Sequence, residues 1–194
     1  MNRLFAKSVS AILNPFVLLA VFPYILILKA NGNNSEAFYW TVFSFIFLLV
    51  FSLLVLIGVE KGYFSDLDVS KRKERPLLYA LAIALSVIYA LFLYFLKAPE
   101  ALFIALFGLI FGLICMEYVN RITKASVHVA TISAFATALT LGYGPAFGLS
   151  FILVPLLAWA RIKTHNHTKK QTLIGAGMGV FITLAVYVIF KYIV

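Results

Sequence analysis

The charged residues are confined to short clusters, and this distribution constrains the fold more than any other feature of the sequence. Asp, Glu, Lys and Arg make up only 12% of the 194 residues, about half the share found in soluble domains. A helix that crosses a bilayer needs about 20 largely apolar residues. Long segments without any charge separate the clusters, and these segments predict an integral membrane protein; they are residues 8–28, 37–59, 77–96, 101–116, 125–160 and 171–190.

The uncharged segment 125–160 is too long for one crossing. Gly142-Tyr143-Gly144-Pro145 inside it is a strong turn signal, and a division there gives seven hydrophobic segments. The piece 146–159 is short and contains Pro155, so six and seven crossings both stay open. A backbone in lipid must satisfy its own hydrogen bonds, and the alternation of a membrane barrel is absent. The sequence therefore predicts an all-α, polytopic transmembrane helical bundle of six or seven helices, with residues 1–194 as a single integral membrane domain.

The basic residues predict the orientation of this bundle. Seven crossings place Lys29, Lys97 and Lys191 on one face and the other 13 of the 16 Lys and Arg residues on the opposite face. The excess of positive charge marks the cytoplasmic side, so we expect the basic face and the N-terminus to be cytoplasmic, in the plasma membrane. The basic residues are too few and too interrupted for a nucleic-acid partner. The lipid bilayer is the expected surrounding, and the oligomeric state stays open.

All three histidines of the chain fall on the predicted basic face, next to the ends of predicted helices. They are His128, His165 and His167, and the loops that converge there are 65–76, 124–128 and 160–171. Arginine offers paired donors to phosphate oxygens, and a helix start adds backbone N–H groups. One imidazole can attack phosphorus while a second protonates the leaving oxygen. This composition predicts phosphate chemistry that needs neither a metal nor another cofactor.

Three short motifs occur in a characteristic order. Arg75-Pro76 comes first, Ser126-Val127-His128 follows, and Arg161 then precedes His167 by six residues. This order and spacing resembles the type 2 phosphatidic acid phosphatase superfamily, whose signature is Lys-x6-Arg-Pro, Ser-Gly-His and Ser-Arg-x5-His-x3-Asp. The resemblance covers roughly residues 66 to 180. It implies a membrane enzyme that hydrolyses phosphate esters through a phosphohistidine intermediate.

The resemblance also implies roles for individual residues. His167 would be the nucleophile and His128 the general acid, and the phosphate would bind to Arg75, Ser126 and Arg161. Asp68 stands where the family has its lysine, so Lys71 or Arg72 would take that place. Val127 and Ala160 replace a glycine and a serine of the signature.

Gln171 occupies the position of the family's aspartate, four residues after His167. On a helix the two side chains share a face, so the amide oxygen can accept the imidazole N–H and orient it without adding charge. Thr168 and Gln171 together also match a helix capping box. Both interpretations of Gln171 stay open, as does a purely structural role for Arg75-Pro76 at a helix start.

The predicted function is hydrolysis of a lipid phosphate or diphosphate, phosphatidate-like or polyprenyl, by a phosphoric ester hydrolase. Asp68 and Gln171 leave open a catalytically weak or inactive lipid-phosphate-binding protein of the same fold. A prenyltransferase is a weaker alternative, suggested by Asp66 and Asp68 beside basic residues, because the chain is short and a second aspartate-rich loop is missing. The glycines at 175, 177 and 179 predict close helix packing and not a phosphate loop.

Overall fold

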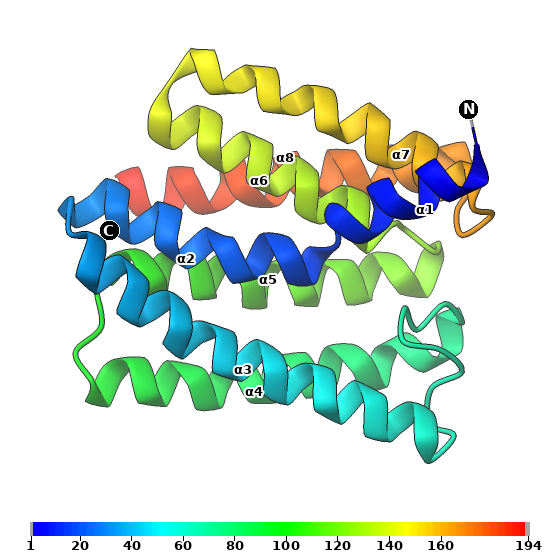
Figure 1. The fold of residues 1–194 in the computed structure, drawn as a ribbon, viewed down its shortest axis with the longest axis horizontal. Helices are drawn as coiled ribbons and strands as arrows, with labels where there is room; N and C mark the ends of the chain where they lie inside the picture. The colour runs from blue at the N-terminus through cyan, green and yellow to red at the C-terminus, as the bar shows by residue number, and fades with distance from the viewer. Residues whose placement is uncertain (1, 193–194) are drawn as a thin grey trace. The chain divides into compact units, whose positions relative to one another are not determined.

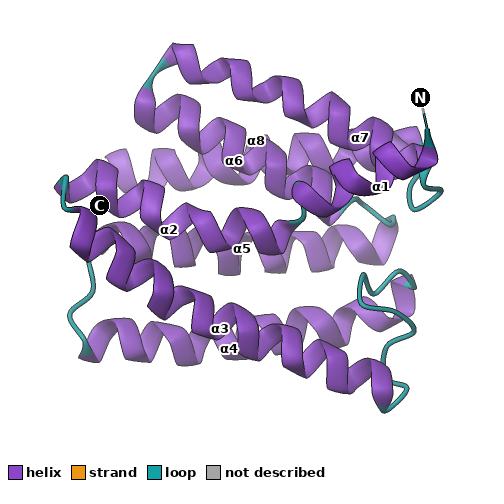
Figure 2. Ribbon diagram, in the orientation of Figure 1, coloured by secondary structure: helices purple, strands orange, loops and turns teal. Residues whose placement is uncertain are grey.

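A computed structural model describes residues 2–192, and every regular element in that range is helical, with no strand (Figure 2). This confirms the predicted all-α class. The α-helices are α1 (Arg3–Ile12), α2 (Pro15–Asn31), α3 (Asn34–Glu60), α4 (Arg75–Phe95), α5 (Glu100–Ile122), α6 (Val127–Tyr143), α7 (Leu153–Lys163) and α8 (Lys169–Tyr192), and the 3-10 helices are η1 (Arg72–Glu74) and η2 (Pro145–Ile152).

Six helical stretches are long and apolar enough to cross a membrane, which makes the chain an integral membrane protein. They are Arg3–Asn31, Asn34–Glu60, Arg72–Phe95, Glu100–Ile122, Pro145–Lys163 and Lys169–Tyr192. The helix α6 is apolar but has only 17 residues, about 25 Å at 1.5 Å per residue. The shortest hydrophobic segment is therefore α6, and the segment after the turn extends over 19 residues once η2 and α7 are joined.

The first hydrophobic segment is not one continuous helix. It breaks at Leu13 and Asn14, because Pro15 has no N–H to donate to the preceding turn. The Asn14 side-chain oxygen accepts a hydrogen bond from the Phe16 N–H at 2.9 Å, which caps the new helix α2. The pattern of charges did not show this break, because neither asparagine nor proline is charged.

The chain divides into two compact units. The first, called here the terminal unit, comprises Met1–Leu18 and Arg121–Val194, and the second, the central unit, comprises Leu19–Asn120. Each unit is described by itself below. The single domain expected from the sequence stays a prediction.

A tight turn links α6 to η2 in the terminal unit, as the sequence predicts. Gly144 lies there with φ 103°, a conformation that favours glycine. After the turn the chain runs back beside α6 through η2 and α7 (Figure 1). This return brings the C-terminal end of α7 back to the end of the unit where α6 begins.

The helices α6 and α8 pack with their backbones unusually close. A Cβ atom on Gly179 would lie 2.2 Å from the carbonyl oxygen of Ala130, and one on Gly175 would lie 2.5 Å from that of Ser126. A side chain at either position would therefore force the two helices apart. The predicted close packing is confirmed for Gly175 and Gly179 and wrong for Gly177, where a Cβ would meet nothing within 4 Å.

The short helix α1 is held against α7. A buried apolar cluster of the terminal unit contains Ala6 and Val9 from α1 together with Leu157 and Ala160 from α7. The rings of Phe5 and Trp159 also contact each other, with centroids 6.1 Å apart. Apolar packing therefore fixes the end of α1, where Ser10 lies, next to the helix break that contains Asn14.

The central unit has its own core. Trp40 from α3 and Leu93 from α4 are buried with Leu106 from α5, and the hydroxyls of Ser44 and Tyr89 lie 2.6 Å apart between α3 and α4. The loop between α3 and α4 carries half of the charged residues of this unit. It ends in η1, directly before Arg75 opens α4.

Candidate functional site

Five polar side chains gather inside the terminal unit, and each is less than one tenth exposed. They come from α1, the start of α6, the end of α7 and the loop before α8. Burying polar groups costs free energy unless they are hydrogen-bonded, and ionisable residues within membrane segments are usually functional. We call this group the histidine cluster; it consists of Ser10, Ser126, His128, Arg161 and His167.

Arg161 lies in the middle of the histidine cluster. Its Nη1 donates to the Ser10 hydroxyl at 2.8 Å. With the amide of Asn166 turned so that its oxygen faces the guanidinium, that oxygen accepts from Nη1 at 3.2 Å and from Nη2 at 3.0 Å. The guanidinium is thus fixed by one residue from α1 and one from the α7–α8 loop, and its position in the last turn of α7 suits a cation.

His128 lies beside this guanidinium. Its Nε2 is 3.5 Å from Nη1 of Arg161 and 3.4 Å from the amide nitrogen of Asn14. Ser126 caps the same helix by accepting from the Val129 N–H at 3.4 Å, and its own N–H donates to the carbonyl oxygen of Gln171 at 3.1 Å. The start of α6 is therefore tied to the start of α8.

His167 reaches Arg161 through the main chain, because its N–H donates to the Arg161 carbonyl oxygen at 3.3 Å. Its ring Nδ1 lies 3.2 Å from Oε1 of Gln171. That same oxygen accepts from the Thr168 N–H at 3.1 Å, and the Thr168 hydroxyl accepts from the Gln171 N–H at 3.3 Å. Gln171 thus makes both contacts considered from the sequence, the capping box and the contact with the imidazole.

These contacts define the state of the His167 ring. A backbone N–H can only donate, so the bond from Thr168 fixes the Gln171 amide with its oxygen toward His167. An amide oxygen can only accept a hydrogen bond, so the Nδ1 atom that faces it in a neutral imidazole must carry the proton. The lone pair of the ring is then at Nε2, the nitrogen on the other side.

His165 does not belong to the histidine cluster. It is exposed and has φ 62°, a left-handed conformation that ends α7. Its N–H donates to the Ile162 carbonyl oxygen at 3.0 Å. The sequence assigned it no position in the motifs, and its geometry is that of a loop residue.

The other predicted phosphate ligands, Lys71, Arg72 and Arg75, belong to the central unit. Lys71 forms an exposed ion pair with Glu74 at 3.6 Å, and Nε of Arg72 donates to the carbonyl oxygen of Asn120. Arg75 is 5% exposed, and its Nε donates to the carbonyl oxygen of Val69 at 3.3 Å. Their role in binding phosphate stays a prediction.

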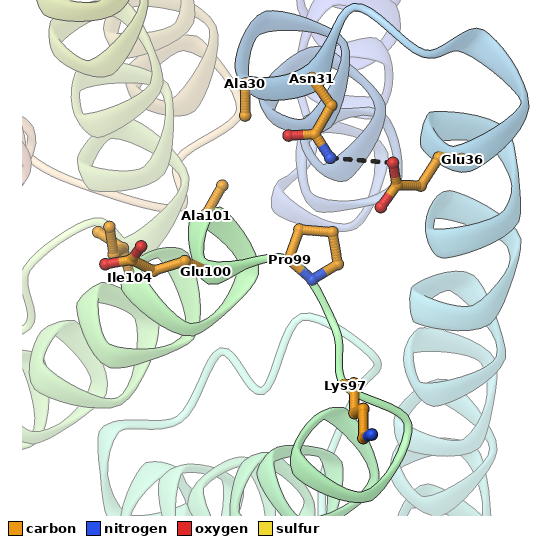
Figure 3. A pocket seen from close by; sticks show the side chains of 8 residues that line it. All are labelled: Ala30, Asn31, Glu36, Lys97, Pro99, Glu100, Ala101 and Ile104. Atoms are coloured by element: carbon orange, nitrogen blue, oxygen red, sulfur yellow. Dashed lines mark hydrogen bonds between the residues drawn. The ribbon is translucent and has the colours of Figure 1, made fainter.

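The central unit also contains a cavity of about 400 Å³, where α2 ends, α3 begins and α4 connects to α5. Figure 3 shows its lining, which includes Lys97 and Glu100 and in which Asn31 donates to Glu36 at 2.9 Å. No histidine or arginine lines it. Within residues 2–192 no three His, Cys, Asp or Glu side chains gather as a metal site would need.

Three residues were not found from the sequence: Ser10, which belongs to the histidine cluster, and Asn14 and Asn166, which contact it. Asn14 had a usable signal, since a polar residue before a proline inside an apolar run is a candidate for function in a membrane protein. Ser10 had none, because serine is common in apolar helices and only the packing of α1 on α7 brings it to Arg161. Asn166 was one of several polar residues in a polar loop.

Comparison with known protein families, with curated proteins and with solved structures finds no match to this chain.

Proposed function

We propose that the chain is a membrane phosphatase that hydrolyses a lipid phosphate or diphosphate through a phosphohistidine on His167. The observation that carries the proposal is the buried Arg161, whose guanidinium is held beside His128 and whose carbonyl oxygen binds the His167 N–H. A guanidinium binds phosphate oxygens with paired, charge-assisted hydrogen bonds. Two imidazoles beside one such group supply the nucleophile and the proton donor that phosphoryl transfer requires.

In the first step, Nε2 of His167 attacks phosphorus. The N–P bond forms while the ester P–O bond breaks, and His128 gives a proton to the leaving oxygen. In the second step, water attacks the phosphohistidine, His128 takes a proton from that water, and the N–P bond breaks to release phosphate and restore the imidazole. Arg161 binds the phosphoryl oxygens in both steps, and Gln171 keeps the His167 ring in place.

The substrate would enter with its head group at the basic face and its tail among the apolar helices. Phosphatidate-like and polyprenyl lipids both fit this description. Ser126 at the start of α6 would supply a further donor. We place the site at the cytoplasmic face of the plasma membrane, with the N-terminus on the same side.

One observation favours a second candidate, binding of a lipid phosphate without turnover. The group that orients His167 is the neutral amide of Gln171, which cannot stabilise an imidazolium by charge. In a serine-protease triad, replacing the orienting aspartate by asparagine lowers turnover about 10⁴-fold. A protein of this kind would keep the affinity for a lipid phosphate that Arg161 provides, but it would hydrolyse the phosphate ester very slowly.

The test measures phosphate released by the purified protein from phosphatidate, a polyprenyl phosphate and a polyprenyl diphosphate. We expect release from at least one of them, and we expect His167→Asn to abolish it. His165→Asn is the matched control and should retain full activity, because His165 is exposed and outside the histidine cluster. Undiminished release by the His167 variant would refute the phosphatase mechanism, and binding without release by the unmodified protein would select the second candidate.

A further inference from the structure

We infer that Asn14 is a positioning residue, which holds His128 in the tautomer whose lone pair is on Nε2. This inference rests on the proposed function, in which His128 moves protons. It adds to the site a residue from the break between α1 and α2, far in sequence from the three motifs.

The orientation of the Asn14 amide is fixed by its own backbone. Its oxygen accepts from the Phe16 N–H at 2.9 Å, and a backbone N–H can only donate. The amide nitrogen is consequently the atom that faces His128, at 3.4 Å from Nε2. One asparagine therefore performs two tasks, since it caps α2 and presents an N–H to the imidazole.

The second neighbour of Nε2 is also a donor. Nη1 of Arg161 lies 3.5 Å from it, and a guanidinium has no acceptor. Asn14 from the helix break and Arg161 from α7 both point N–H groups at the same ring nitrogen. That arrangement favours a neutral imidazole whose Nε2 accepts and disfavours a proton there.

This has a consequence for the catalytic cycle. In the absence of an anion, His128 rests without the Nε2 proton that a general acid must give. When a phosphate binds to Arg161, its negative charge favours the protonated ring, so the acid would form together with the bound substrate. Asn14 would thereby keep the resting site neutral at His128 until an anion arrives.

The test uses nitrogen NMR of the full chain in detergent micelles, labelled with ¹⁵N-histidine. The chain has three histidines, so His165→Asn and His167→Asn assign the remaining signal to His128. At neutral pH without phosphate, we expect an unprotonated Nε2 at His128. Asn14→Asp should move that signal to the protonated form, because the carboxylate keeps the cap on Phe16 but replaces the N–H donor by an acceptor.

Asn2→Asp is the matched control. Asn2 caps α1 through the same kind of bond, from the Leu4 N–H at 3.4 Å, and should leave the His128 signal where it is. A protonated Nε2 in the unmodified protein would overturn the inference, and so would an Asn14→Asp spectrum identical to that of the unmodified protein.

The two proposals fail separately. If His167→Asn abolishes phosphate release but Asn14→Asp leaves the His128 signal unchanged, the phosphatase function is supported and the proposed role of Asn14 is wrong. If the signal responds as expected but the unmodified protein releases no phosphate from any lipid, Asn14 positions His128 in a protein that is not a phosphatase.

Discussion

The polar contacts of the two units reach over different distances along the chain. In the loop before α4 of the central unit, Ser65 donates to Glu74, nine residues away, and Ser70 donates to Asp66, four residues away. Arg72 of the same loop reaches further and donates to the carbonyl oxygen of Asn120, 48 residues away. In the terminal unit, Arg161 binds Ser10 across 151 residues and His128 contacts Asn14 across 114. Contacts between near neighbours shape a loop, whereas contacts over such separations form only when the helices have packed, and they build a site.

Burial separates Lys71 from the histidine cluster, although the central unit also buries polar residues, since Arg75 is 5% exposed and Asn120 is 3% exposed. Lys71 of the central unit is 70% exposed in its pair with Glu74, and an exposed pair contributes little to stability. Arg161 and His167 are 4% and 6% exposed, in surroundings where an unsatisfied polar group is costly. A change in the histidine cluster should therefore affect function or folding strongly, and a change in the loop before α4 should affect them weakly.

The largest effect is expected at Arg161. Arg161→Lys keeps the charge but loses the planar pair of donors, and we expect phosphate release to fall about 10³-fold, as when a group that stabilises the transition state is removed. Arg72→Lys is the matched change in the central unit, and we expect activity within about twofold of the unmodified protein. Initial rates of both variants, compared at equal amounts of monodisperse protein, measure the contrast. Equal losses at the two arginines would break the comparison between the units.

The second largest effect is expected for the contact between α6 and α8. Gly179→Ala would place a Cβ 2.2 Å from the Ala130 carbonyl oxygen, and overpacking against backbone should cost about 3 kcal/mol. In the central unit, Gly58→Ala would place a Cβ 2.5 Å from the ring of Phe64. This ring is only 2% exposed, so we expect a cost of about 2 kcal/mol.

Thermal unfolding midpoints in detergent measure both variants of this pair. Gly177→Ala serves as the control, since its Cβ meets nothing within 4 Å, and it should leave the midpoint unchanged or higher. If Gly179→Ala is as stable as Gly177→Ala, the close approach of α6 and α8 is wrong.

A smaller and opposite effect is expected at Gln171. Gln171→Glu has the same shape and keeps the acceptor for His167 and Thr168, but it adds the negative charge that a phosphorylated imidazole needs nearby. We expect kcat to rise about tenfold, a fraction of the effect of an orienting aspartate in a catalytic triad. The measurement is kcat on the best lipid substrate, and a fall in kcat would show that the neutral amide is itself required.

The smallest effect is expected at Lys71. Lys71→Gln removes an exposed ion pair with Glu74, which contributes little because water screens it and the long side chain must be ordered to form it. We expect no measurable change in the thermal midpoint and activity within about twofold of the unmodified protein. A large loss of activity with the midpoint unchanged would show that Lys71 takes part in binding the substrate.

Much of the fold could be predicted because lipid imposes simple rules. The absence of charge between 77 and 96 predicted α4, and Gly144-Pro145 predicted the turn after α6, where φ is 103°. The break at Asn14 was not predicted, because a proline inside an apolar run is tolerated in some membrane helices and ends others. Whether such a proline ends the helix depends on what the freed backbone groups contact.

For the site, the motifs singled out His128, Arg161 and His167, and the structure brings these three together in the terminal unit. Side-chain type and spacing carry that much information. The residues that hold them could not be identified in the same way, because Ser10 reaches Arg161 only through the packing of α1 on α7. A supporting residue of this kind has no chemistry of its own and is found only when the packing is known.

The central claim is that His128, Arg161 and His167 act on one anion, and a titration with inorganic phosphate tests it most directly. In ¹⁵N-histidine spectra of the full chain, we expect the signals of His128 and His167 to shift together with one dissociation constant, while that of His165 stays unchanged. Arg161→Met should remove both shifts. Two different dissociation constants, or a shift of one histidine alone, would contradict the claim.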